Sequence, residues 1–424
     1  MATVPDVLRV PAFRRFWLAS LASNAGSWLQ IVAAGYLIYH LTGSPAAVGA
    51  LALVARGPAF VLSTYGGQLA DRHDRRSVGI VTFGLQAVGA GVLAALTWAD
   101  LLSPAAIYVC SFLVGVGFAL GLPSMLALVG ELATRERLPE AVALNAAGIN
   151  LARLAGPALG GLVLAILGAG ACFALNAISF LAVIWVLAGL PRFLPHDVRA
   201  GVGMRGALSY ARRDPAIRRL LIGMVVFATL AAPVQELAPV VAARLDAGKV
   251  GLGLLLGAMG GGALVGAWGL EGLSRNGYPR HHALPTATTA FAVGVAVVAA
   301  SPWFGLTLAA MAFCGFFWIW MFIATNTAIQ LRSPREMLGR MLGLYQLSVV
   351  GPIAVGALAA GGLAQAVGIG WSLGACALGL GAYGVWSLTH RVSEIDGIGR
   401  ESAPDLAGGV LEGVSARARR ARAG

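Results

Sequence analysis

Long apolar runs constrain this chain more than any other feature. Twelve of them follow one another, and each approaches the length of about 20 residues that a helix needs to cross a hydrocarbon core. Only 11% of the residues are charged and 58% are hydrophobic, whereas soluble domains contain about 25% charged residues. We therefore expect an all-α membrane protein rather than a soluble enzyme. The predicted spans are residues 16–39, 46–68, 77–98, 103–129, 142–167, 170–190, 217–241, 250–272, 282–300, 303–331, 338–366 and 368–389.

The basic residues predict the orientation of these spans. The net charge is +12, and all basic residues except Lys249 are arginines. With twelve spans, nearly every arginine falls in the termini and in the loops on the same side as the termini, and only Arg244 and Lys249 fall on the other side. Cytoplasmic loops retain positive charge, so we expect both termini in the cytoplasm and a multi-pass protein of a bacterial cytoplasmic (inner) membrane. The charge gives no reason to expect a nucleic-acid partner.

The chain divides at its longest interior polar segment. Residues 191–216 are rich in arginine and contain three prolines, which predicts a cytoplasmic linker between six-helix bundles at 1–190 and 217–390. An amphipathic stretch at 204–221 is expected on the membrane surface. The halves repeat weakly: TRERL at 134–138 corresponds to PREML at 334–338, and Gly-Pro pairs follow in both halves. The tail, 391–424, is polar, glycine-rich and basic, which is typical of disorder.

The segment GGQLADRHDRRS, residues 66–77, joins the second and third spans. A small residue at Gly67 allows a neighbouring helix to approach closely, and the Asp71 carboxylate can accept N–H groups at a helix N-terminus. Together with LIYHLTGSPAAVG at 37–49 and ERLPEAVALNA at 136–146, this loop resembles the major facilitator superfamily, in the subfamily of enterobactin exporters and macrolide efflux proteins. Where the superfamily loop has a second glycine, this chain has Asp74.

The resemblance implies a conformational latch at this loop. In the family, the partner of the Asp71 carboxylate is the start of the eleventh helix, here near 335–340. Arg72, Arg75 and Arg76 are then expected to pair with Glu131, and the latch would stabilise the outward-open state. The alternative is that these charges serve only the positive-inside rule.

The fifth span contains GPALGG, with Gly156, Pro157, Gly160 and Gly161. Glycines four apart permit close helix packing, and the proline removes a backbone hydrogen bond and bends the helix. The segment resembles the antiporter signature of the superfamily, although its upstream glycine positions hold alanines. It therefore implies export by antiport, against the alternative of ordinary glycine-mediated packing.

Polar residues within the spans are candidates for the substrate cavity or for coupling. The first span has Ser20, Ser23, Asn24, Ser27 and Gln30 on one helical face, which should line a cavity. Many relatives have Asp at the position of Ser27. Ionisable residues at membrane depth are costly and commonly functional, and here they are Arg56, Arg153 and Glu236. The two arginines would attract an anionic or catecholate-like substrate or serve as structural ties, and Glu236 would be a protonatable coupling group or an interfacial carboxylate.

The tenth span adds Asn326 and Gln330 below an aromatic run at 316–322, whose rings would either stack on a substrate or pack in the core.

The sequence contains no phosphate-binding loop, no catalytic triad and no metal-ligand cluster. We therefore expect no cofactor and no enzymatic activity. The predicted function is secondary active export of a hydrophobic or amphiphilic small molecule, drug-like or siderophore-like, by alternating access and proton antiport, in a monomer surrounded by lipid. The alternatives are an uptake symporter or facilitator and, in another class, a membrane receptor or membrane-embedded enzyme on a transporter scaffold.

Overall fold

The computed structural model describes residues 5–134, 136–193, 204–275, 280–334 and 337–389. The predicted disordered tail and the middle of the predicted linker lie outside these ranges. Across the described ranges the regular structure is helical, without strands, which confirms the predicted all-α class. A short 3-10 helix, η1 (Asp6–Arg9), precedes the first long helix. The α-helices are α1 (Pro11–Thr42), α2 (Pro45–Arg72), α3 (Arg75–Trp98), α4 (Pro104–Leu132), α5 (Leu138–Ala188), α6 (Met204–Arg213), α7 (Pro215–Ala231), α8 (Pro233–Glu236), α9 (Ala238–Arg244), α10 (Gly248–Arg275), α11 (Arg280–Ala300), α12 (Phe304–Arg332), α13 (Leu338–Val367) and α14 (Ile369–Thr389).

Local sequence signals explain where many helices begin and end. Proline occupies the first turn of α1, α2, α4 and α7, where its missing N–H costs nothing. The side chains of Ser44, Ser103 and Asp214 cap α2, α4 and α7 by accepting backbone N–H groups. Gly43 ends α1 in the left-handed region, at φ 63°, a conformation that costs glycine little.

Three predicted spans differ in detail from the helices. The long α5 contains both the fifth and the sixth predicted spans, which meet at Gly168, where φ is 82° and the helix is broken. The predicted span 217–241 is not one helix, because α7 ends at Ala231 and the short helices α8 and α9 follow. Pro233 and Pro239 lie in the first turns of these short helices and cannot continue the hydrogen-bond ladder of the helix before them.

The amphipathic stretch 204–221 is also divided. It consists of α6 and the first turns of α7, and Asp214 and Pro215 mark the boundary between them. Ala207, Tyr210 and Ala211 of α6 are buried, so this helix packs on the protein through its apolar face.

Nine helical segments of the described residues are long and apolar enough to cross a membrane. This set counts α5 once and does not include α1; the apolar part of α11, Leu284–Ala300, is shorter than the rest. Each of the twelve predicted spans falls within helical segments, but the exact number of crossings stays a prediction.

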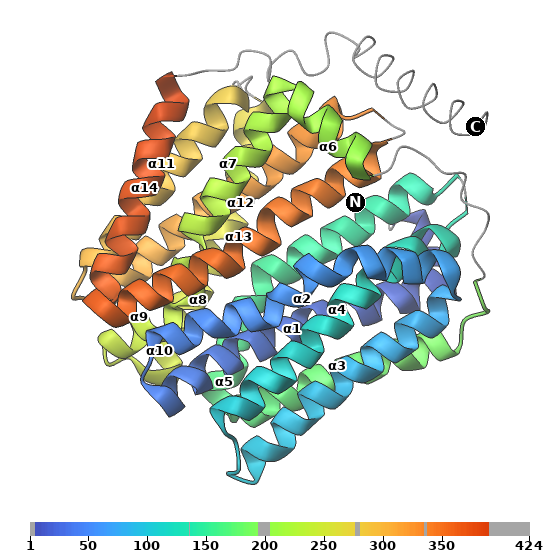
Figure 1. Ribbon diagram of the computed structural model, residues 1–424, viewed down its shortest axis with the longest axis horizontal. Helices are drawn as coiled ribbons and strands as arrows, with labels where there is room; N and C mark the ends of the chain where they lie inside the picture. The colour runs from blue at the N-terminus through green and yellow to red at the C-terminus, as the bar shows by residue number, and fades with distance from the viewer. Residues whose placement is uncertain (1–4, 135, 194–203, 276–279, 335–336, 390–424) are drawn as a thin grey trace, which may run out of the picture.

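The long helices form two bundles (Figure 1). In the first, α1 packs on α5, α2 on α4, and α3 on both α4 and α5; in the second, α10 packs on α12, α11 on α12 and α14, and α13 on α7. The bundles meet where α2 packs against α13 and α5 against α10. In the two halves of the chain, α2 corresponds to α10, and the first part of α5 corresponds to α13. The α2–α13 contact is therefore the counterpart of the α5–α10 contact, as expected for related six-helix units.

The two ends of the molecule differ in how closely the bundles approach. We call the end with Arg72, Arg75, Arg137 and Arg332 the Arg-rich end, and the end with Gly43 and Gly368 the opposite end. Near the opposite end, α2 and α13 lie side by side, and they diverge toward the Arg-rich end (Figure 1). A Cβ atom added to Gly49 of α2 would lie only 2.4 Å from the Ala357 carbonyl oxygen of α13. The bundles are therefore closed against each other at the opposite end.

Candidate functional site: a central cavity between two bundles

A cavity of about 370 Å³ lies between the bundles, within the usual range for small-molecule sites. Its walls come from α1 to α5 of the first bundle and from α8, α9, α10, α12 and α13 of the second. Most lining residues are apolar, and Phe16, Met125 and Asn145 extend the lining toward the Arg-rich end. The site thus joins both halves of the chain.

The polar face of α1 lines this cavity. Ser20, Ser23, Asn24, Ser27 and Gln30 are all among the lining residues. Asn24 and Ser27 donate to the carbonyl oxygens one turn earlier, at 2.8 and 2.9 Å, so their helix satisfies part of their hydrogen-bonding capacity. Gln30 accepts a 2.7 Å hydrogen bond from Asn176 of α5. These bonds place hydroxyl and amide groups on an otherwise apolar wall.

Arg56 and Glu236 form one ion pair between the bundles. The two guanidinium nitrogens of Arg56 lie 3.0 and 2.8 Å from the two carboxylate oxygens of Glu236. The side chains are only 16% and 10% exposed, and both line the cavity. Such a bidentate pair is strong and directional. It connects α2 to α8, so the two residues are mutual partners rather than separate sites.

Arg153 of α5 also lines the cavity, but a carboxylate does not neutralise it. Its guanidinium carbon lies 4.9 Å from the ring centroid of Phe322 in α12. The hydroxyl of Tyr345 in α13 donates to the Phe322 carbonyl at 3.3 Å. With the residues that the structure describes, Arg153 makes neither a hydrogen bond nor an ion pair.

The aromatic run of α12 is divided between two roles. Trp318 and Phe322 line the cavity, whereas Trp320 donates to the Gly266 carbonyl at 2.8 Å and packs against Phe316. The two predicted cavity residues further along the helix, Asn326 and Gln330, are not among the lining residues; Gln330 instead donates to Asn326 on its own helix. They lie about one and two turns beyond Phe322, toward the Arg-rich end.

The glycines of GPALGG face two different helices. A Cβ atom at Gly156 would lie 2.5 Å from the Trp28 ring of α1, and one at Gly160 would lie 3.1 Å from Val32. Gly161 faces the other bundle, where its Cβ would lie 2.3 Å from the Cα of Gly253 in α10. Pro157 lies within α5. The motif therefore packs α5 against α1 and α10 and closes one side of the bundle interface.

The predicted latch between Asp71 and the start of α13 is not formed among the described residues, and residues 335 and 336 of the predicted partner segment lie outside them. Asp71 is exposed, and it makes no hydrogen bond or ion pair within the described part of the chain. The side chain of Met337, the N-cap residue of α13, makes no capping hydrogen bond. The expectation of a close contact at Gly67 is also not met, since open space surrounds this position; it is Gly66 that packs closely, against the carbonyl of Ala119. The reason is that Gly66 is on the face of α2 that packs against α4.

The arginines of the loop have separate partners. Arg75 forms an ion pair with Glu131, whereas Arg76 donates to the Ala188 carbonyl at 2.8 Å and Arg72 is exposed. Asp74 caps α3 and accepts a 2.8 Å hydrogen bond from the Phe193 backbone. Burial alone raises the pKa of the Asp74 carboxyl, but hydrogen bonds from Ser77, Phe193 and Arg76 outweigh burial and leave this pKa below its ordinary value.

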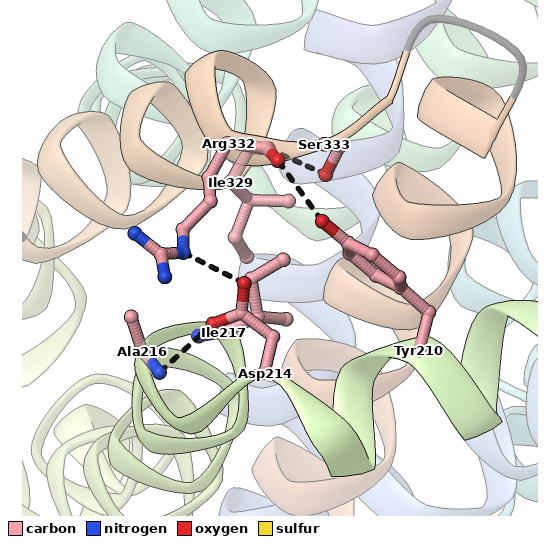
Figure 2. A network of polar contacts seen from close by, with 7 residues as sticks. All are labelled: Tyr210, Asp214, Ala216, Ile217, Ile329, Arg332 and Ser333. Atoms are coloured by element: carbon pink, nitrogen blue, oxygen red, sulfur yellow. Dashed lines mark hydrogen bonds and ion pairs between the residues drawn. The ribbon is translucent and has the colours of Figure 1, made fainter. Parts of the chain in front are cut away.

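A second carboxylate joins α7 to α12 at the Arg-rich end (Figure 2). Asp214 is buried and accepts the backbone N–H groups of Ala216 and Ile217, both at 3.0 Å. Its other oxygen accepts from Arg332 at 2.7 Å. Tyr210 of α6 donates to the Arg332 carbonyl at 3.4 Å, so α6 is attached to the second bundle.

Sequence reasoning missed several of these residues. Asn176, an amide within an apolar span, could have been found by its cost at membrane depth. Asp214 precedes Pro215, which is a helix-start signal, and Asp74 was treated only as a departure from the family loop. No sequence signal pairs Arg56 with Glu236, because the two residues are 180 positions apart.

Comparison with known proteins agrees with this geometry. Residues 3–416 match the family model described as transmembrane secretion effector. The chain is 30% identical over 360 residues to the enterobactin exporter EntS of Salmonella typhi, with 83% of this chain and 86% of that one covered. It is 29% identical over 363 residues to the exporter of the same name from Citrobacter koseri, with 83% and 85% covered.

Solved structures share the fold at low identity. A bacterial homologue of the human lysosomal transporter Spinster, inward-facing and unoccupied, gives a TM-score of 0.68 at 14% identity and covers 92% of this chain and 100% of its own. A POT family transporter in complex with a thioalcohol-conjugated peptide gives 0.69 at 12% identity, covering 89% and 95%. The fold, the loop motif and the family match lead to one conclusion: the chain belongs to the transmembrane secretion effector family of major facilitator transporters.

Proposed function

We propose that this protein exports a hydrophobic or amphiphilic small molecule across a bacterial cytoplasmic membrane by alternating access. The observation that carries the proposal is the central cavity, which has mostly apolar walls and a few polar groups and is built from both bundles. The relatives at about 30% identity, named as enterobactin exporters, support export as the direction and a siderophore-like molecule as one substrate class.

Alternating access requires contacts that form at one end while those at the other end break. At the opposite end the Arg56–Glu236 pair and the Gly161–Gly253 contact hold the bundles together. At the Arg-rich end Asp71 and the start of α13 would form the contact of the other state. In this scheme the substrate enters from the Arg-rich end in the conformation described here and leaves at the opposite end after the latch has formed.

Proton antiport is the proposed source of energy, and the Arg56–Glu236 pair is its proposed site. Protonation of Glu236 would remove the negative partner of Arg56 and weaken the tie between α2 and α8. This step would couple proton entry to opening of the opposite end. The protein is proposed to act as a monomer in the lipid bilayer.

The proposed orientation places the Arg-rich end in the cytoplasm, following the positive-inside rule. The four native cysteines are all buried, which favours a labelling test in intact cells. A membrane-impermeant maleimide should label Lys249→Cys, at the opposite end, and should not label His73→Cys. Labelling of His73→Cys alone would reverse the orientation.

The direct test is transport in proteoliposomes with an imposed pH gradient, run in both directions. Purified protein should transport an amphiphilic substrate in the direction opposite to the proton flow, and this transport should stop when the pH gradient is collapsed. Substrate transport in the same direction as the protons would instead indicate an uptake symporter. Substrate transport at a rate independent of the pH gradient would indicate a facilitator.

A further inference from the structure

The charges around the cavity do not balance. Three lining residues carry a formal charge at neutral pH: Arg56, Arg153 and Glu236. Arg56 and Glu236 neutralise each other through two hydrogen bonds. Arg153 therefore leaves the described lining with one uncompensated positive charge.

The surroundings of Arg153 leave its N–H groups available. A guanidinium carries several donors in a planar fork that suits a carboxylate or a similar anion. In the described structure the guanidinium of Arg153 lies over the face of Phe322. The ring face attracts the cation but accepts none of its hydrogen bonds in the manner of a carboxylate. A positive charge at this depth is costly unless a partner offsets it.

Aromatic rings surround the position where such a partner would bind. Trp28 of α1 packs against α5 at Gly156, three residues beyond Arg153. Trp318 and Phe322 line the cavity from α12, with ring centroids 5.1 Å apart. A ligand with an aromatic body and one acidic group would place the ring among these side chains and its negative charge on the guanidinium.

We propose that the substrate is an aromatic amphiphile with a net negative charge, and that Arg153 is the residue that selects for this charge. The inference rests on the proposed transport function and adds the charge class of the substrate. Because Arg153 comes from the first bundle while Phe322 and Tyr345 come from the second, an anion bound here contacts the guanidinium at the seam between the bundles.

The test compares three probes with the same ring system: 2-naphthoate, its neutral methyl ester and the cation 2-naphthylmethylamine. Binding is measured by equilibrium dialysis against protein in lipid nanodiscs, with empty nanodiscs subtracted. Wild type should bind the anion most tightly. Arg153→Gln should weaken anion binding by about 10 to 100-fold, the effect of losing one charge-assisted interaction, and should leave ester binding nearly unchanged.

Two further variants separate recognition from structural damage. Arg153→Lys keeps the charge and should recover part of the anion preference. Arg15→Gln removes an exposed arginine outside the cavity lining and should bind all three probes as wild type does. An equal loss for all probes in Arg153→Gln would show that the arginine is only a tie between α5 and α12.

Other outcomes distinguish the inference from the proposed function. Wild-type binding without preference among the probes, or with preference for the amine, overturns the inference while pH-driven export of the preferred probe would leave the transport function intact. If wild-type protein binds the anion tightly and selectively but shows no pH-driven flux, the proposed transport function is overturned and the inference about substrate charge stands.

Discussion

At the scale of single residues, the Arg56–Glu236 pair carries the most mechanism. Sequence reasoning found both residues, because ionisable groups are rare within apolar spans. It treated them as independent candidates, since a pairing across 180 residues depends on how α2 packs against α8. Their bidentate contact makes Glu236, which by sequence is a protonatable coupling group or an interfacial carboxylate, one half of a tie between α2 and α8.

We therefore expect Glu236→Gln to lose pH-driven export while it still inserts and folds. The substitution keeps the shape of the side chain but removes the charge-assisted interaction, which is typically about 1.5 to 3 kcal/mol. Arg56→Gln should have a similar effect, and the double variant should be less impaired than the sum of the two, because both act on one interaction. Export rates of the four proteins in a double-mutant cycle provide the measurement. Normal flux by Glu236→Gln would remove the residue from the mechanism.

The lowered pKa of the Asp74 carboxyl predicts that pH affects the stability of the protein through this residue rather than its transport. Its folded-state pKa lies below the ordinary value of 3.8, so its contribution is fully present above that value and is lost as the pH falls through the lowered pKa. Asp74→Ala should cost about 1 kcal/mol at neutral pH through loss of the α3 cap. The difference in stability between Asp74→Ala and wild type should therefore become smaller as the pH falls.

The measurement is thermal unfolding of wild type and Asp74→Ala in detergent, from about pH 6 down to about pH 3. Other carboxylates titrate in both proteins, so the difference between the two curves isolates Asp74. A constant difference across this range would show that the cap acts without its charge.

At the scale of helices, local signals predicted the breaks but not the contacts. Proline is a helix-breaking residue that can be read from the sequence, and Pro233 and Pro239 lie where α8 and α9 interrupt the seventh span. GPALGG indicated close packing, but its partner in the other bundle, Gly253, could not be chosen from a chain with 58 glycines. Only three-dimensional packing distinguishes a glycine at a helix crossing from one in open space.

Two glycines of α10 give a matched test of this crossing. A Cβ atom at Gly253 would lie 2.7 Å from the Gly161 carbonyl oxygen, whereas nothing lies within 4 Å of one at Gly257. Gly253→Ala should weaken closure of the opposite end by about 1 to 3 kcal/mol, as overpacking does. Gly257→Ala should be neutral or slightly stabilising, because alanine favours the helix.

The readout is the accessibility of Ala52→Cys, a cavity position on α2, to an impermeant maleimide added at the opposite end. Labelling should increase with Gly253→Ala and stay at the wild-type level with Gly257→Ala. Equal labelling of the two variants would mean that the α5–α10 contact does not control closure.

At the scale of the whole molecule, the apolar runs and their spacing predicted the all-α membrane fold, and the resemblance of the loop at 66–77 and of two further segments indicated the superfamily. They carried no information about which conformation the protein adopts, because both states of a transporter share one sequence and one set of helices. The structure adds this: the bundles are closed together at the opposite end, and Asp71 is unengaged with the described residues at the other.

The central claim is that contacts at the two ends form alternately, with Asp71 holding one state and Arg56–Glu236 the other. Asp71→Asn should remove about 1.5 to 3 kcal/mol from the latched state alone and shift a balanced equilibrium about 10 to 100-fold toward the conformation described here. Glu236→Gln should shift it in the reverse direction.

The most direct measurement uses spin-label distances between the bundles in lipid, with one pair at each end. His73→Cys with Gly339→Cys reports the Arg-rich end, and Leu41→Cys with Ala366→Cys reports the opposite end. Asp71→Asn should lengthen the first distance and shorten the second relative to wild type, and Glu236→Gln should do the reverse. Distances that stay unchanged in both variants, or that change together in the same direction at both ends, would contradict alternating access controlled by these residues.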